Sequence, residues 1–305
     1  MVNGVAHKAI KRTTVASGTE LRILPLGDSI TWGIYSTDGN GYRLDLQNDL
    51  SGSNLLYVGS QQGGSMADNF NEGHPGATIN QIAGYADASL PERPNIVLVH
   101  AGTNDLASES PTDPYNTAPD RLGALIDKIV AACPDAAVLV AQIVHAGDAD
   151  ADARIQTFND AVPGVVAQRA NAGKHVMVVD MRSVTASDLQ PGPHALHPSD
   201  EGYNKMASIW FTALQAADAN GWIRAPVGPD PSTGAAGKQQ CGSAPFWYAA
   251  NGDKQLASGI GTGGNGILNS NWLPQGQIFS GIELNGTGVR FADINGDGEW
   301  PITSS

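Results

Sequence analysis

Four residues that could carry out chemistry stand in separate short stretches of the chain: Ser29 in GDSITWG, Gly76 in EGHPGATINQI, Asn104 in AGTND and His197 in LHPSDEGY. A serine hydroxyl is a weak nucleophile, and it needs a neighbouring base, most often histidine, and donors that stabilise an oxyanion. Ser29 could supply the nucleophile and His197 the base. The side-chain amide of Asn104 and a backbone N–H at Gly76, where no side chain is in the way, could supply the donors. The set predicts nucleophilic acyl chemistry if the four stretches meet in space.

The elements that must position these residues alternate regularly between about residues 20 and 222. Short β-branched apolar runs predict strands at 21–26, 55–58, 95–100, 137–144 and 175–179. Helical periodicity predicts helices that include 118–132, 153–172 and 199–219, the last with Ser199 as its N-cap. This alternation is typical of an α/β fold with a mostly parallel, five-stranded sheet and helices on both faces. Functional loops in such sheets lie at the carboxyl ends of the strands, and Ser29 directly follows the first one.

The four stretches, in this order, resemble the signature blocks of the SGNH hydrolase superfamily, also called GDSL-type esterases and lipases. The resemblance covers about residues 20 to 220. It implies a flavodoxin-like, three-layer α/β/α fold in which Ser29 is the nucleophile and His197 the general base. It also implies an oxyanion hole made by the backbone N–H groups of Ser29 and Gly76 and the amide of Asn104, with no cofactor required for catalysis.

One position departs from the family pattern. The last block usually reads Asp-x-x-His, whereas this chain has His194 at the place of the acid that orients His197. Two interpretations stay open: a Ser–His dyad, or an atypical triad in which neutral His194 accepts from His197. A cationic His194 would repel the imidazolium formed in the transition state, so activity should fall more steeply on the acid side. Asp180, Asp188 and Asp200 are other carboxylates close in sequence, and His100, at the end of a buried strand, is expected to be a hydrogen-bonded structural histidine.

Charge limits the partners of this protein. The net charge is −13, the pI is near 4.7, and the 17 Lys and Arg residues are spread along the chain. Nucleic acids and anionic membranes are disfavoured because they require clustered basic residues, and no apolar run approaches the roughly 20 residues that span a bilayer. The N-terminal segment lacks the apolar core of an intact signal peptide. We nevertheless expect secretion, with the signal absent from this sequence, and the sequon Asn285-Gly286-Thr287 agrees with it. The oligomeric state is left open.

The two cysteines, Cys133 and Cys241, are too few for a disulfide scaffold and wrongly spaced for zinc. Either one is buried and the other exposed, or a single bridge joins the C-terminal tail to the main domain.

The composition changes after residue 225. We expect an N-terminal extension at 1–20, a catalytic domain at 21–225, a Pro- and Gly-rich linker at 226–240 and a small Gly-rich β or irregular extension at 241–305. VRFADINGDG in this tail resembles a truncated FG-GAP or VCBS repeat. Asp293, Asn295 and Asp297 could form a weak, structural calcium loop or a solvated acidic turn.

The pattern HAGTNDL with LHPSDEGYNKMA most resembles carbohydrate esterase family three, whose members remove acetyl groups from xylan. The resemblance implies hydrolysis of small acyl esters, foremost acetyl, on an acylated carbohydrate through an acyl-enzyme. Short-chain lipid or aryl esters are the alternative substrates. A weakly active or inactive hydrolase-derived protein that binds carbohydrate, and a tail that occludes the site, are the alternatives to a freely active enzyme.

Overall fold

The computed structural model describes residues 14–108, 110–192, 195–228, 284–285 and 288–289. The chain divides into two compact units, Met1–Gln240 and Cys241–Ser305. In the second unit the described residues form the short strands β8 (Leu284–Asn285) and β9 (Gly288–Val289), paired antiparallel. Cys241 and the loop of Asp293, Asn295 and Asp297 lie outside the described residues, as does the rest of the segment that resembles FG-GAP repeats.

The first unit is built on one sheet with the strand order β3-β4-β1-β5-β6-β7, in which β2 also pairs with β1. Every pairing is parallel except that of β3 with β4. The strands are β1 (Glu20–Gly27), β2 (Asn54–Tyr57), β3 (Gln61–Gln62), β4 (Phe70–Gly73), β5 (Ile96–His100), β6 (Ala137–Ala141) and β7 (Val176–Val179). The central strands β5 and β6 are buried along their whole length, as expected of a parallel sheet covered on both faces.

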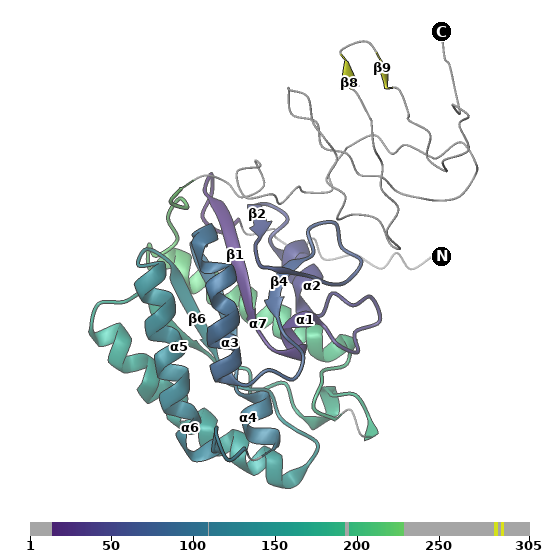
Figure 1. Cartoon of the computed structure of the whole chain (residues 1–305), viewed down its shortest axis with the longest axis vertical. Helices are drawn as coiled ribbons and strands as arrows, with labels where there is room; N and C mark the ends of the chain where they lie inside the picture. The colour runs from purple at the N-terminus through teal and green to yellow at the C-terminus, as the bar shows by residue number, and fades with distance from the viewer. Residues whose placement is uncertain (1–13, 109, 193–194, 229–283, 286–287, 290–305) are drawn as a thin grey trace, which may run out of the picture. The chain divides into compact units, whose positions relative to one another are not determined.

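Helices cover both faces of this sheet, as Figure 1 shows for α3, α5 and α6 in front of it. The α-helices are α1 (Ser29–Trp32), α2 (Tyr42–Asp49), α3 (Ile79–Tyr85), α4 (Thr103–Ala107), α5 (Ala118–Ala132), α6 (Ala149–Asn171) and α7 (Asp200–Ala219). Short 3-10 turns are η1 (Ala86–Ala88), η2 (Leu90–Glu92), η3 (Tyr115–Thr117) and η4 (Ala186–Asp188). The fold is therefore a three-layer α/β/α arrangement with a mostly parallel sheet.

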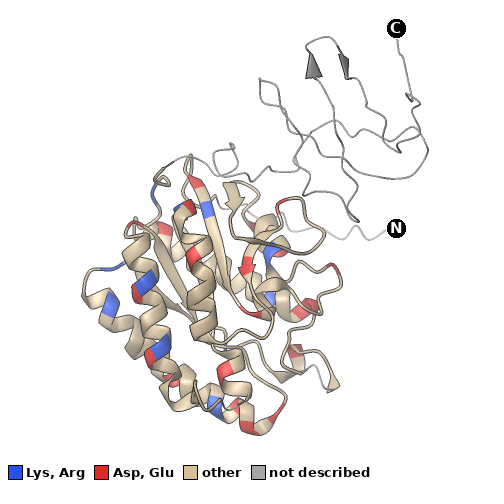
Figure 2. Cartoon of the chain, viewed as in Figure 1, with Lys and Arg blue, Asp and Glu red and all other residues tan. Residues whose placement is uncertain are grey.

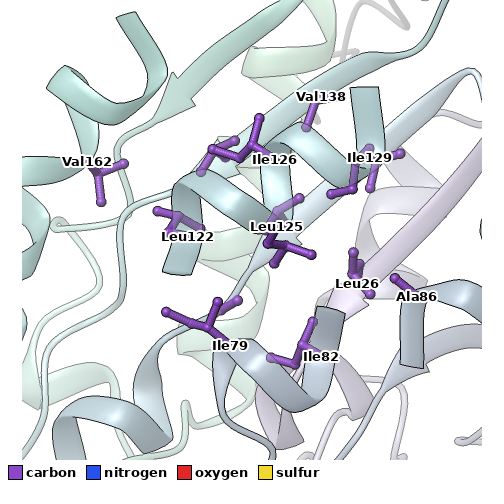
Figure 3. Close-up of a cluster of buried hydrophobic side chains, with 14 of the residues drawn as sticks. Leu26, Ile79, Ile82, Ala86, Leu122, Leu125, Ile126, Ile129, Val138 and Val162 are labelled. Carbon is purple, nitrogen blue, oxygen red and sulfur yellow. The ribbon is translucent and has the colours of Figure 1, made fainter. Parts of the chain in front are cut away.

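Side chains on the two faces of the sheet belong to two separate hydrophobic cores. On one face, Leu24 and Leu26 of β1 pack with the apolar stripes of α3, α5 and α6, and Figure 3 shows the part of this cluster between α3 and α5. On the other face, Leu21 and Ile23 pack with α2 and α7, around the fully buried Trp210. Each large side chain that is fully buried contributes about 1.5–3 kcal/mol to folding. The two cores hold β1 rigidly, and with it the turn at its carboxyl end.

The predicted elements are confirmed with shifted ends. α5 spans the predicted residues, whereas α6 begins four residues before the prediction because Asp148 caps it by accepting from the N–H of Ala151 at 2.8 Å. β6 ends at Ala141 rather than at 144, since the N–H of Ile143 turns to Asn159 Oδ1 at 2.7 Å. The sheet has seven strands rather than five, because β3 and β4 are too short and polar to be recognised as apolar runs.

The chain packs onto this unit before β1 begins. Val15 is only 1% exposed, and the N–H of Ala16 donates to Asp218 Oδ2 of α7 at 2.8 Å. At the other end, Asn95 Nδ2 donates to the carbonyl of Arg224 at 2.6 Å.

Basic residues do not gather on the face seen in Figure 2, where Lys and Arg lie among acidic residues of the described helices and strands. In the part of the chain that the structure describes, no helix combines the length and the apolar character needed to cross a membrane.

Candidate active site

The nucleophile turn is fixed by the residues around Ser29. Gly27 ends β1, and a Cβ at this position would lie 2.3 Å from the carbonyl oxygen of His100, so only glycine fits. Asp28 then caps α1, its Oδ1 accepting from the N–H of Ile30 at 2.9 Å. Gly33, with φ of 96°, ends this single helical turn in the left-handed conformation. Ser29 therefore stands at the carboxyl end of a buried strand and the N-terminus of a helix, and it is 7% exposed.

The predicted nucleophile and base meet. Ser29 Oγ lies 2.8 Å from His197 Nε2, although 168 residues separate them in the sequence. His197 precedes α7, whose first turn is capped by Ser199, as predicted from the sequence. An imidazole at this distance can take the hydroxyl proton, which is the geometry required of a general base.

Gly76 lies in a tight turn between β4 and α3. The N–H of Ala77 donates to the carbonyl of His74 at 3.0 Å, and Gly76, with φ of 80°, follows Pro75. Proline followed by a glycine of positive φ is the residue pair of a type II turn. The bond that closes the turn uses the N–H of Ala77 and not that of Gly76. A Cβ on Gly76 would meet nothing within 4 Å, so glycine is required here by the backbone conformation and not by space. The turn is tied to the nucleophile strand, since the N–H of His74 donates to the carbonyl of Gly27 at 3.0 Å.

Asn104 is joined to the same turn. Its Nδ2 donates to the carbonyl of Ala77 at 2.9 Å from the first turn of α4. A primary amide carries two N–H donors, so one can hold the glycine turn while the other serves an oxyanion. The structure thus brings Ser29 to His197 and joins Asn104 to the turn that contains Gly76, and the bond from His74 to Gly27 links this turn to the end of β1.

Comparison with known proteins agrees with this geometry. The model of the GDSL-like Lipase/Acylhydrolase family matches residues 26–205, which include all four residues. The chain belongs to this family. Residues 26–205 are therefore a carboxylic ester hydrolase domain.

Relatives of this GDSL-like chain include carbohydrate-active proteins. A solved structure described as a family 3 carbohydrate esterase from Clostridium thermocellum is 32% identical, with a TM-score of 0.57; the match covers 66% of this chain and 100% of that one. A multidomain esterase of Ruminococcus flavefaciens is 26% identical over 81% of this chain, and a putative endoglucanase X of Acetivibrio thermocellus is 31% identical over 44% of it. The matches span only 34% and 56% of the lengths of these two curated relatives.

Asp105, next to Asn104, joins the helices on either side of the predicted oxyanion donors of this GDSL-like domain. Its Oδ2 accepts from the N–H of Ile79 at the start of α3 at 2.9 Å, and its Oδ1 pairs with Arg121 of α5 at 2.8 Å. Asp105 is 1% exposed, and burial raises the pKa of its carboxyl although Arg121 lowers it. This residue was not predicted as functional, yet the motif AGTND contains it directly after Asn104. It fixes the helix that carries Asn104 against the helix that follows Gly76.

A second brace holds the Gly76 turn from the strand side. His74 Nε2 lies 2.5 Å from Oε1 of the fully buried Glu72, and the ring of His74 stacks on Tyr85 at a centroid distance of 3.8 Å. Glu72 also accepts from the N–H and the hydroxyl of Ser60 at 2.8 and 2.7 Å, and from the hydroxyl of Ser89. Polar residues at these spacings give no recognisable sequence signal, because their partners come from three separate loops.

Two buried titratable groups lie next to the nucleophile turn. Burial raises the pKa of Asp28 to about 6, although hydrogen bonds to its carboxylate lower it. Burial lowers the pKa of His100 to about 4, so this imidazole is neutral at physiological pH. His100 is buried, as expected of a structural histidine. The expectation that it is hydrogen-bonded is wrong, because neither ring nitrogen bonds to another described residue. Removal of the ring from solvent is therefore what keeps it neutral.

The three carboxylates considered as orienting groups are bonded elsewhere. Asp180 pairs with Arg182 at 2.8 Å, Asp188 with Lys205 at 2.6 Å, and Asp200 accepts from the N–H of Thr37 at 2.8 Å. His194 lies outside the described residues, so its role in orienting His197 stays a prediction.

Cys133 is buried, forms no disulfide with another described residue, and has its Sγ 3.5 Å from the carbonyl oxygen of Leu90. Cys241, its partner in one of the two alternatives, lies outside the described residues, so the choice between a bridge and two thiols stays open. Among the described side chains, no group of three or more His, Cys, Asp or Glu is arranged to hold a metal ion.

Proposed function

We propose that this protein hydrolyses acetyl esters on an acetylated plant polysaccharide such as acetylxylan, through an acyl-enzyme on Ser29. The observation that carries the proposal is the 2.8 Å contact between Ser29 Oγ and His197 Nε2 at the carboxyl end of β1. The 32% identity to a protein described as a family 3 carbohydrate esterase supports the substrate class. Catalysis in this proposal uses no cofactor, and the enzyme acts outside the cell, where such polysaccharides occur.

Acylation begins when His197 Nε2 takes the proton of Ser29 Oγ as this oxygen bonds to the ester carbonyl carbon. The carbonyl oxygen becomes an oxyanion, held by the N–H groups of Ser29 and Gly76 and by the amide of Asn104. When the tetrahedral intermediate collapses, the bond to the sugar oxygen breaks, and this oxygen receives the proton from His197.

Deacylation repeats the sequence with water. His197 takes a proton from water as the water oxygen attacks the acetyl group on Ser29. Collapse of the second intermediate breaks the bond to Ser29 Oγ, and the returning proton restores the hydroxyl. Acetate is then released, and the enzyme is regenerated.

Acetate release from acetylated xylan by wild type and by Ser29→Ala tests the proposal. We expect release by wild type and a loss of at least 10³-fold in the variant. Turnover of short lipid or aryl esters with no acetate from xylan would instead favour the alternative substrates. No turnover of any ester combined with measurable glycan binding would favour the carbohydrate-binding alternative.

The variant His194→Asp distinguishes the two interpretations of the base. An increase in kcat with a shallower acid limb identifies an atypical triad in which His194 occupies the place of the acid, whereas an unchanged profile identifies a dyad.

A further inference from the structure

Tyr35 is an exposed aromatic ring beside the general base. Its side chain lies edge-on to His197, with ring centroids 5.0 Å apart and an interplanar angle of 72°. It is 46% exposed, which places it among the few large apolar side chains that the described part of the chain presents to solvent. An aromatic ring that is held against the catalytic base and open to solvent is available to a substrate.

The backbone holds this ring in place at an energetic cost. Tyr35 has φ of 65°, the left-handed region, which is unfavourable for a bulky side chain by roughly 1–2 kcal/mol. Such a conformation persists only where the surroundings fix it, and strained residues of this kind cluster at ligand sites.

The surroundings that fix Tyr35 come from two segments after β7. Gln190 Nε2 donates to the carbonyl of Tyr35 at 3.0 Å, and the hydroxyl of Tyr203 donates to the carbonyl of Ile34 at 2.8 Å. On the following side, the N–H of Thr37 donates to Asp200 Oδ1 at 2.8 Å. The segment between α1 and α2 is thereby fastened to the first turn of α7, next to which it runs in Figure 1.

The chemistry of the reaction decides which part of the substrate lies near Tyr35. His197 returns the proton to the leaving alcohol, so the alcohol must lie on the His197 side of Ser29. The acyl oxygen lies instead toward Gly76 and Asn104. Tyr35 contacts the imidazole itself and therefore borders the space of the alcohol.

A polar cavity borders the residues that directly follow Tyr35 in the chain and the first turn of α7. It has a volume of about 150 Å³ and is lined by Ser36, Thr37, Asp38, Gly41, Asp45, Asp200 and Tyr203. One water molecule needs only about 10–15 Å³, so the cavity has room for a ring bearing several hydroxyl groups. Ionised carboxylates act only as acceptors, and each can take several hydrogen bonds. Three carboxylates in the lining therefore suit a neutral ligand rich in hydroxyl donors and repel an anionic one.

We infer that Tyr35 and the carboxylates Asp38, Asp45 and Asp200 form the subsite for the leaving alcohol, and that this alcohol is a neutral sugar that packs on the tyrosine ring. The inference rests on the proposed function and names the residues that select its substrate class. Tyr35 lies outside the four motifs, so the motifs alone do not point to this subsite.

The test compares kcat/KM for acetylated xylobiose with kcat/KM for ethyl acetate, which has the same acyl group and no ring. Loss of the stacking ring in Tyr35→Ala should lower the ratio of the two values about tenfold. Tyr35→Phe keeps the ring and should keep the ratio within about twofold of wild type. Asp45→Ala should also lower this ratio, through a higher KM for the sugar ester. This result would show that the subsite includes the cavity, as inferred.

Tyr85→Ala is the matched control, because Tyr85 is 43% exposed and its ring also contacts a histidine, His74. This variant should keep the wild-type ratio of the two kcat/KM values, even if it changes kcat/KM for each ester by the same factor. An unchanged ratio in Tyr35→Ala overturns the inference, because the ring would then only position His197. A preference of wild type for acetylcholine over acetylated xylobiose also overturns it, since a ring beside carboxylates would then bind a cation. Wild-type turnover of ethyl acetate without turnover of the sugar ester overturns it as well, whereas turnover of no ester overturns the proposed function.

Discussion

At the scale of single residues, the chemistry depends on where a few donors and protons are held. The sequence predicted that the four motifs lie close together, because they follow strands of one sheet. The structure agrees in the 2.8 Å contact between Ser29 and His197 and in the bond from Asn104 to the turn that contains Gly76. Tyr35 was not predictable as a functional residue, because its position depends on a strained backbone and on Gln190, which is 155 residues away in the sequence.

The amide of Asn104 should act mainly in the transition state. Asn104→Ala removes the donor for the oxyanion and is expected to lower kcat by about 10²–10³-fold with a small change in KM. Steady-state kinetics with p-nitrophenyl acetate measures both constants. A variant that changes KM alone would show that Asn104 binds the ground state instead.

The two buried groups beside the nucleophile turn should give opposite pH dependences of stability. The pKa of His100 is about 4 in the folded protein, below its ordinary value of 6.5. The free energy of unfolding is therefore highest above pH 6.5 with respect to this group, and it decreases as the pH falls toward 4. The pKa of Asp28 is about 6, above its ordinary 3.8, so stability is lost as the pH rises from 3.8 to 6. Each effect amounts to about 3 kcal/mol.

Thermal unfolding between pH 4 and 7 can separate the two effects. His100→Met should lose less stability than wild type as the pH falls from 6.5 to 4. Asp28→Asn keeps the cap acceptor and should gain stability relative to wild type as the pH rises toward 6. Parallel pH profiles for both variants and wild type would contradict the assigned shifts.

At the scale of elements, the site depends on how helices are fastened to one another. Strand and helix positions followed from the periodicity of apolar residues. This periodicity could not reveal β3 and β4, because the two glutamines of β3 and the single apolar side chain of β4, Phe70, make no apolar run. The hydrogen bonds and ion pair of Asp105 could not be predicted from periodicity either. They join α3, α4 and α5, and their partners are known only from the folded chain.

Removing Arg121 should therefore be costly. Arg121→Met leaves the carboxylate of Asp105, whose side chain is fully buried, without its cationic partner, and should lower the free energy of unfolding by about 3–5 kcal/mol. Adding Asp105→Asn to this variant removes the buried charge and should recover part of the loss. Urea unfolding of the single and double variants gives the values, and equal stability of Arg121→Met and wild type would show that the ion pair contributes nothing.

At the scale of the whole molecule, the hydrolase domain and the C-terminal unit are separate in the chain. The family match ends at residue 205, and the solved family 3 carbohydrate esterase is covered completely by 66% of this chain. The composition change after residue 225 predicted a boundary in this region, whereas the structure and role of the tail could not be derived from one repeat-like motif.

Residues 1–228 alone are accordingly expected to hydrolyse p-nitrophenyl acetate with a kcat within about twofold of that of the full chain, since all four site residues and both cores lie within them. A markedly faster truncated chain would identify the tail as an occluding segment. A slower one would show that the tail supports the catalytic unit.

The measurement that tests the account most directly is the site of covalent labelling by an organophosphate ester, which traps an activated serine. We expect one adduct per chain, located on Ser29 by mass spectrometry, with esterase activity lost in proportion to labelling and no adduct in Ser29→Ala. An adduct on another residue, or full activity with Ser29 labelled, would contradict the account.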